Sequence, residues 1–195
     1  MSKQIAAIKG FIFDLDGTLM HANLDFEYLR QAVGCPMDTD ILTHVDGLNH
    51  ELRTQALHII IQHEIEDACT ASWINGAAEF VQRIADDVIP MAIVTRNCRQ
   101  AAQRKLADSI QHFEVVLTRE DALPKPDPDA LLKIAKQWQI PVSGLAYIGD
   151  YLYDVQAANR AGMLSCLYAP NGVPDYADQA DIVFSDFAQL ATWLD

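Results

Sequence analysis

The sequence predicts an α/β fold, a doubly wound, Rossmann-like parallel sheet that carries a small inserted α-helical segment. Three observations lead to this fold class. Six short apolar runs have the length of strands, and most lack polar alternation, as is typical of strands covered by helices on both faces. Amphipathic helical patterns alternate with these runs, which favours a parallel sheet. The interval between the first two runs is too long for a single crossover helix.

The expected strands are rich in Ile, Val, Leu and Phe, and they cover residues 8–15, 89–95, 113–117, 145–149, 164–168 and 181–184. Helices of the sheet domain are expected where apolar residues recur every three to four positions. In the first of these helices Ala77, Phe80, Val81 and Ile84 share one face. The four expected helices cover residues 76–87, 127–139, 154–161 and 185–194, with Ser185 as the N-cap of the last helix.

The long interval after the first strand is helical in pattern throughout. Its expected helices cover residues 24–33, 39–48 and 50–71. We therefore expect residues 1–17 and 76–195 to form the α/β core and residues 18–75 to form an inserted helical cap. The Pro-rich stretch at 124–128 predicts a loop, because a helical pattern resumes directly after it.

Composition excludes several classes of protein. The chain has 195 residues, half of them hydrophobic, so it is able to bury a core and disorder is not expected. Its 14 Lys and Arg against 27 Asp and Glu leave a net charge of −13, which disfavours a nucleic-acid partner. No apolar stretch is long enough for a membrane span, and no leader is expected. The four cysteines form no CxxC pair, so a reduced, cytoplasmic protein is expected; its oligomeric state stays open.

Four polar clusters follow predicted strands, at the ends where open parallel sheets bind ligands. They are Asp14-Leu15-Asp16-Gly17-Thr18, Thr95-Arg96-Asn97, Lys125 between two prolines, and Asp150 with Asp154. If these loops converge, four aspartates meet one lysine, and carboxylates gathered so closely either have raised pKa values or recruit a cation. Hard oxygen ligands with no His or Cys beside them favour Mg²⁺.

The four clusters, in this order, resemble the signature motifs of the haloacid dehalogenase (HAD) superfamily. They are Asp-x-Asp-Gly-Thr, a threonine ending the next strand, a proline-flanked lysine, and Gly-Asp-x-x-x-Asp. The likeness extends over roughly residues 8–170. The helical insertion resembles the cap of the phosphoglycolate phosphatase and β-phosphoglucomutase branch.

The resemblance implies a role for each motif residue. Asp14 would be the nucleophile that forms an aspartyl-phosphate, and Asp16 would protonate the leaving oxygen and then activate water. Thr95 would hydrogen-bond the phosphoryl oxygens, and Lys125 would neutralise the developing charge. The implied Mg²⁺ ligands are Asp14, Asp16 through its backbone carbonyl, Asp150, and Asp154 either directly or through water.

Other residues are candidates for contacts with the substrate. Arg96 follows Thr95 where relatives often have a small or amide residue, and His21 lies just after the nucleophile loop. The expected substrate-binding set is Thr95, Arg96, Asn97, Lys125 and His21. The remaining cap histidines lack metal-binding spacing and are expected to be solvated or to face a partner.

The expected function is that of a Mg²⁺-dependent phosphatase acting on a small phosphorylated metabolite, similar to phosphoglycolate phosphatase. A sugar phosphomutase with the same core and a non-catalytic phospho-accepting or binding protein are the alternatives. Asp16 and the second acidic pair disfavour a dehalogenase, and a cap without lysine disfavours a phosphonatase. Arg30 and Arg53 are the only cap cations against nine acids, which predicts a leaving group that is neutral or anchored by one arginine.

Overall fold

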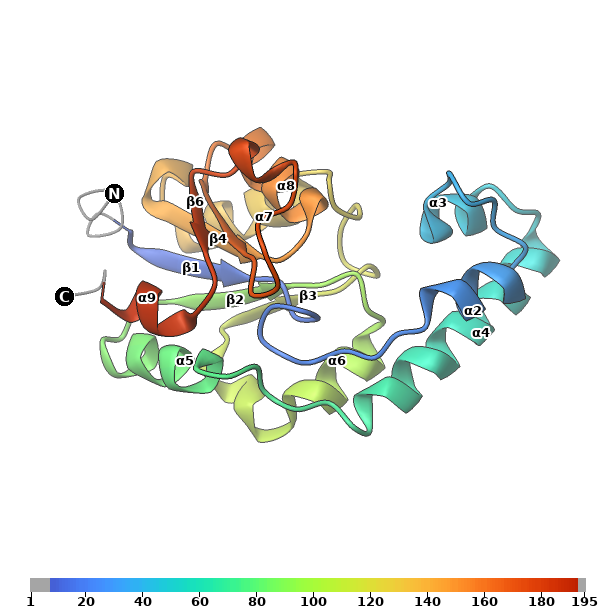
Figure 1. The fold of residues 1–195 in the computed structure, drawn as a ribbon, viewed down its shortest axis with the longest axis horizontal. Helices are drawn as coiled ribbons and strands as arrows, with labels where there is room; N and C mark the ends of the chain where they lie inside the picture. Colours follow the sequence, from blue (N-terminus) through green and yellow to red (C-terminus); the bar gives the residue numbers. More distant parts are fainter. Residues whose placement is uncertain (1–7, 193–195) are drawn as a thin grey trace.

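The computed structural model describes residues 8–192; the end of the expected C-terminal helix lies outside this part. One sheet of six strands has the order β3-β2-β1-β4-β5-β6, and every neighbouring pair is parallel (Figure 1). This confirms the predicted fold class. The strands are β1 (Gly10–Phe13), β2 (Met91–Val94), β3 (Val115–Leu117), β4 (Leu145–Gly149), β5 (Leu164–Tyr168) and β6 (Ile182–Phe184).

Helices cover both faces of the sheet. Successive side chains of a strand point to opposite faces, so Phe11 and Phe13 of β1 pack with α5, α6 and α9, whereas Ile12 packs with α7 and α8 (Figure 1). The core helices are α5 (Ala77–Asp86), α6 (Arg99–Leu106), α7 (Asp129–Trp138), α8 (Leu152–Ala161) and α9 (Phe187–Ala191). Three short 3₁₀ turns complete the core, η1 (Ala107–His112), η2 (Val142–Gly144) and η3 (Ala177–Gln179).

Two local features differ from the expectations. Helix α6 was not expected between the second and third strands, because its sequence RQAAQRKL has few apolar residues to set a periodicity. The last helix begins one residue later than predicted. Its N-cap is Asp186, whose carboxylate accepts the Ala188 N–H, and not Ser185.

The segment between β1 and α5 contains the expected cap helices, α2 (Phe26–Ala32), α3 (Ile41–Asp46) and α4 (His50–Ala68). Asp25, Asp40 and Asn49 cap their N-termini through side-chain oxygens. Leu29, Val45 and other apolar residues of the three helices form a separate small core. No helix within residues 8–192 is long and apolar enough to cross a membrane.

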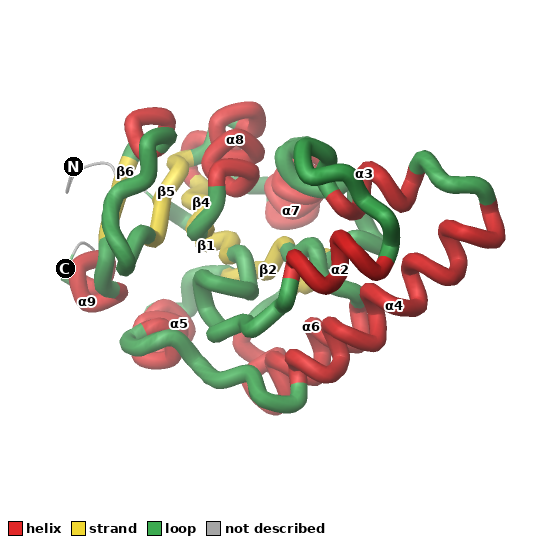
Figure 2. The backbone as a smooth tube through the Cα atoms, turned by 45° about the vertical axis from the view of Figure 1, so that its right-hand side comes forward, coloured by secondary structure: helices red, strands yellow, loops and turns green. Residues whose placement is uncertain are grey.

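Helix α4 is docked on the core along its C-terminal half, where it runs beside α6 (Figures 1 and 2). Ala68 of α4 is buried with Cys98 and Ala101. The buried Glu64 accepts the Cys98 N–H at 2.9 Å and lies 2.5 Å from an Arg119 guanidinium nitrogen. The longest cap helix is therefore anchored by buried polar contacts as well as by apolar packing.

Candidate active site

The predicted site residues gather at the carboxyl ends of β1, β2 and β4. They face a cavity of about 690 Å³ between these loops and the cap helices. The sequence-predicted residues that line it are Asp14, Asp16, Thr95, Arg96, Asn97, Lys125, Asp150 and Asp154. His21 is exposed and is not among the lining residues, so its contact with a substrate stays a prediction.

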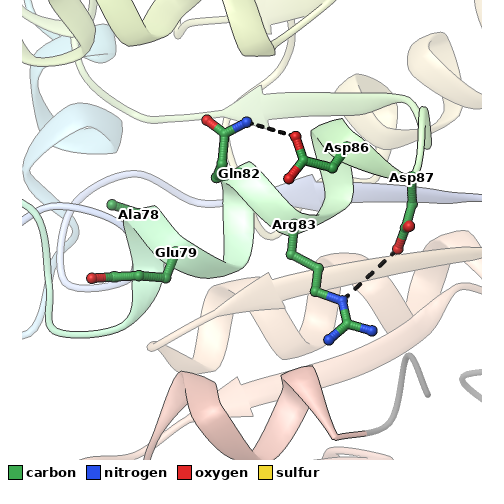
Figure 3. A pocket seen from close by; sticks show the side chains of 6 residues that line it. All are labelled: Ala78, Glu79, Gln82, Arg83, Asp86 and Asp87. Atoms are coloured by element: carbon green, nitrogen blue, oxygen red, sulfur yellow. Dashed lines mark hydrogen bonds and ion pairs between the residues drawn. The ribbon is translucent and has the colours of Figure 1, made fainter.

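A second hollow lies on the outer face of α5 and is lined by residues of that helix and its end alone (Figure 3). Gln82 pairs with Asp86 there, and Arg83 with Asp87. None of the four motif clusters reaches this hollow. The candidate site is therefore the larger cavity.

Lys125 joins the first and last motifs through buried ion pairs. Its ammonium lies 2.5 Å from Asp14 Oδ1 and 2.7 Å from Asp154 Oδ1. The Tyr147 hydroxyl donates to the same Asp154 oxygen at 2.9 Å, and the Tyr151 N–H donates to the other at 3.0 Å. Burial by itself would lower the pKa of Lys125, but the two carboxylates outweigh burial and raise it. Lys125 therefore stays charged.

The three carboxylates around Lys125 carry more negative charge than this one lysine can balance. One oxygen from each of Asp14, Asp150 and Asp154 can be chosen so that all three lie within 4.8 Å of one another. Burial is the main cause of the raised pKa of Asp14, although Lys125 opposes it. Burial and the nearby Asp154 charge raise the pKa of Asp150 to about 6. This all-oxygen donor set with unbalanced charge fits a small hard cation such as Mg²⁺.

Two glycines leave room for this acidic group. Gly17 has a φ of +78°, and a Cβ built there would lie 2.3 Å from Asp150 Oδ2. A Cβ at Gly149 would lie 2.3 Å from atoms of the Asp154 side chain. A larger residue at either position would therefore displace a carboxylate of the triad.

The Asp16 carboxylate is held by two donors that do not contact this triad. Its Oδ2 accepts from the Asn97 amide at 2.6 Å, and its Oδ1 lies 2.5 Å from the Lys105 ammonium. The metal contact implied for Asp16 used its backbone carbonyl and stays a prediction. Both oxygens of the Asp16 carboxylate are thus held by donors on other elements of the core.

Lys105 is the site residue that sequence reasoning missed. It belongs to α6, where Ala101, Ala102 and Leu106 form the rest of the buried face. A lysine four residues after Ala101, on the apolar face of a helix, was the available signal. Because α6 has few apolar residues, this position does not stand out in the sequence.

The residues after β2 have separate roles. Thr95 is buried, and its hydroxyl accepts the Asn97 N–H at 3.1 Å. Arg96 reaches the cap, where its Nη2 lies 2.7 Å from both carboxylate oxygens of Asp40, and its guanidinium stacks over the Tyr153 ring. Arg96 therefore lines the cavity while it links the core to the N-terminus of α3.

The acidic triad predicts a dependence of stability on pH in the metal-free protein. The pKa of Asp150 is about 6 in the folded chain against about 3.9 when unfolded, so the folded state binds more protons between these values. The free energy of unfolding is therefore expected to fall, by roughly 1–2 kcal/mol, as pH rises from about 4 to about 6. Thermal unfolding in EDTA at a series of pH values measures this decline in stability.

The control for this prediction is Asp150→Asn, which should lose most of the decline. Saturating Mg²⁺ should also cancel it in the unmodified protein by stabilising the ionised carboxylates. An identical decline in the variant would contradict the assignment to Asp150.

Comparison with known proteins agrees with this geometry. The family model of haloacid dehalogenase-like hydrolases matches residues 11–168, which span all four motif clusters. The chain belongs to this family. A HAD-like hydrolase domain-containing protein of Arabidopsis thaliana is 30% identical over 181 residues, covering 85% of this chain and 72% of the relative.

Three further comparisons bear on this HAD-like hydrolase. A phosphoglycolate phosphatase of Pectobacterium atrosepticum is 26% identical over 216 residues, covering 96% of this chain and 92% of the relative. The crystal structure of a hydrolase from Pseudomonas syringae superposes with a TM-score of 0.80 at 22% identity, covering 94% of this chain and 96% of that one. The superposition on the Pseudomonas syringae hydrolase shows that the two chains share a fold. A validoxylamine A 7'-phosphate phosphatase of Streptomyces hygroscopicus subsp. limoneus is 23% identical over 200 residues, so two of the relatives are named as phosphatases.

Proposed function

We propose that this HAD-like hydrolase is a Mg²⁺-dependent phosphatase that cleaves a small phosphate monoester through an aspartyl-phosphate. The observation that carries the proposal is the buried cluster in which Lys125 contacts Asp14 while Asp150 and Asp154 complete an acidic triad. Within residues 8–192 no donor contacts Asp14 Oδ2, so this oxygen is available to the reaction. Asp16 lies beside it with its own donors.

The reaction divides into two half-reactions. In the first, an Asp14 oxygen bonds to phosphorus, the bond from phosphorus to the ester oxygen breaks, and Asp16 gives a proton to the departing oxygen. In the second, water attacks phosphorus, Asp16 takes a proton from it, and inorganic phosphate leaves as Asp14 is regenerated. Lys125 offsets the negative charge that grows on the phosphoryl oxygens. Bound Mg²⁺ would add further charge neutralisation there.

The cap side of the cavity supports a leaving group that is neutral and partly apolar. Its wall includes Leu24, Phe26, Met37, Ile41 and Leu42. Arg30 lines the cavity, but its guanidinium already donates to the carbonyls of Pro36 and Thr39. Arg53 pairs with Asp46 on the surface and is not a lining residue.

Phosphate release from a panel of esters tests the proposal. The panel contains a monoester of an uncharged aliphatic alcohol, phosphoglycolate, and a sugar bisphosphate. We expect Mg²⁺-dependent release, with kcat/KM for the uncharged alcohol ester at least about 10-fold above that for the bisphosphate. Phosphoglycolate should fall between them, because its one carboxylate competes with Asp40 for Arg96.

Three results would count against this function. Equal turnover in EDTA and in Mg²⁺ would show that the reaction does not require the metal. Isomerised product without inorganic phosphate would indicate a mutase. A stable phosphorylated Asp14 with negligible turnover would indicate a phospho-accepting protein.

A further inference from the structure

The geometry points to Lys105 as a positioning residue for Asp16, held in that role by Asp67 of the cap helix α4. Its ammonium lies 2.5 Å from Asp16 Oδ1 and 2.6 Å from Asp67 Oδ2. The inference rests on the proposed function, because it concerns how Asp16 is held for proton transfer. It assigns a task to a residue outside the four motif clusters.

Burial of Lys105 is the first argument. Its side chain has 0% exposure, and its neighbours on α6 are alanine and leucine. Burying an ammonium is unfavourable unless it is paired, and an apolar side chain of similar volume often packs at least as well. Packing alone therefore does not account for a lysine at this position.

The second argument is the orientation of Asp16. Lys105 holds one carboxylate oxygen, and the Asn97 amide holds the other at 2.6 Å. Asn97 is itself buried, and Lys105 extends from a packed helix. Two donors on separate elements, one on each oxygen, restrict the orientation of the Asp16 carboxylate. Without Lys105 the carboxylate would rotate about its side-chain bonds.

Asp67 supplies the third argument. Its Oδ2 holds Lys105, and its Oδ1 accepts the Asn23 N–H at 2.7 Å, in the segment that leads from β1 into the cap. Asp67 is buried at the end of α4. The orientation of Asp16 therefore depends on the docked position of a cap helix and on the segment that enters the cap.

The test uses leaving groups of different reactivity. An alkoxide needs a proton to depart, whereas p-nitrophenolate does not. In Lys105→Met we expect kcat for an alkyl phosphate to fall roughly 10- to 100-fold and kcat for p-nitrophenyl phosphate to fall less than about 3-fold, with KM little changed. Lys105→Arg should recover part of the loss. The exposed Lys133→Met is the matched control and should match the unmodified protein on both esters.

A double-mutant cycle shows whether Lys105 acts through Asp16. Asp16→Ala alone should reduce alkyl phosphate turnover more than aryl turnover, and adding Lys105→Met to it should have no further effect. If the losses of turnover in Asp16→Ala and Lys105→Met multiplied in the double variant, the inference would be overturned. Equal losses of turnover on both esters in Lys105→Met would overturn it as well. Lys105→Met with Asp67→Asn removes the unpaired buried charge. It should restore thermal stability without restoring alkyl phosphate turnover.

Failure of this inference is distinguishable from failure of the proposed function. If the unmodified protein releases no phosphate from any ester, the function itself is wrong. If it is active and Lys105→Met keeps the same ratio of alkyl to aryl turnover, only the role of Lys105 is wrong.

Discussion

Replacement of Asp14 by asparagine is expected to lower phosphate release by at least about 10⁴-fold, because an amide cannot attack phosphorus as the carboxylate does. The fold should persist. The asparagine carbonyl can still accept from Lys125, and the variant removes one charge from a cluster whose burial already raises the pKa of Asp14. Phosphate release and the mass of a phosphorylated protein intermediate are the measurements.

The control for Asp14→Asn is Asp108→Asn, which changes an exposed aspartate away from the cavity. It should leave both measurements unchanged. A folded Asp14→Asn protein that keeps turnover within 10-fold of the unmodified protein would refute the assignment of the nucleophile.

Replacement of Lys125 by methionine is expected to have the largest effect on stability. In metal-free protein it should reduce the free energy of unfolding by about 3–5 kcal/mol, because the buried Asp14 and Asp154 lose the cation that pairs with both. Added Mg²⁺ should recover part of the loss by binding to the triad. Denaturant unfolding with and without Mg²⁺ measures the change in the free energy of unfolding. Turnover by the Lys125→Met protein should fall as well.

A second variant separates charge from packing in this result. Lys125→Met with Asp154→Asn removes one of the unpaired carboxylates and should be more stable than Lys125→Met alone. Lys133→Met, at an exposed ion pair, should change stability by less than about 1 kcal/mol. If metal-free Lys125→Met unfolded at the same denaturant concentration as the unmodified protein, the triad would not need this lysine.

Most of the fold was predictable because the strands are continuous apolar runs buried on both faces. Residues of β1, β2 and β4 are buried throughout, so their hydrophobicity alone locates them. Helix α6 was not predictable in this way. It packs through two small alanines, one leucine and one paired lysine, which give only a weak apolar periodicity.

The site was predictable where function is concentrated at strand ends. Asp14, Lys125 and Asp154 are far apart in sequence, but parallel topology brings the ends of their strands and loops together. The contacts of Arg96 with Asp40 and of Lys105 with Asp67 were not predictable, because both aspartates belong to the insertion. Their contacts depend on how that insertion docks, which no local pattern records.

The docking of α4 has a consequence for how this protein could be taken apart. Cutting out residues 18–75 would deprive Lys105 of Asp67 and Arg119 of Glu64. Lys105 would keep its pair with Asp16, but Arg119 would lose the acid that balances its charge where the helix had covered it. The insertion is thus not a detachable accessory to a self-sufficient sheet. A chimera that exchanges this segment for that of a relative would have to keep an acid opposite each of Arg96, Lys105 and Arg119.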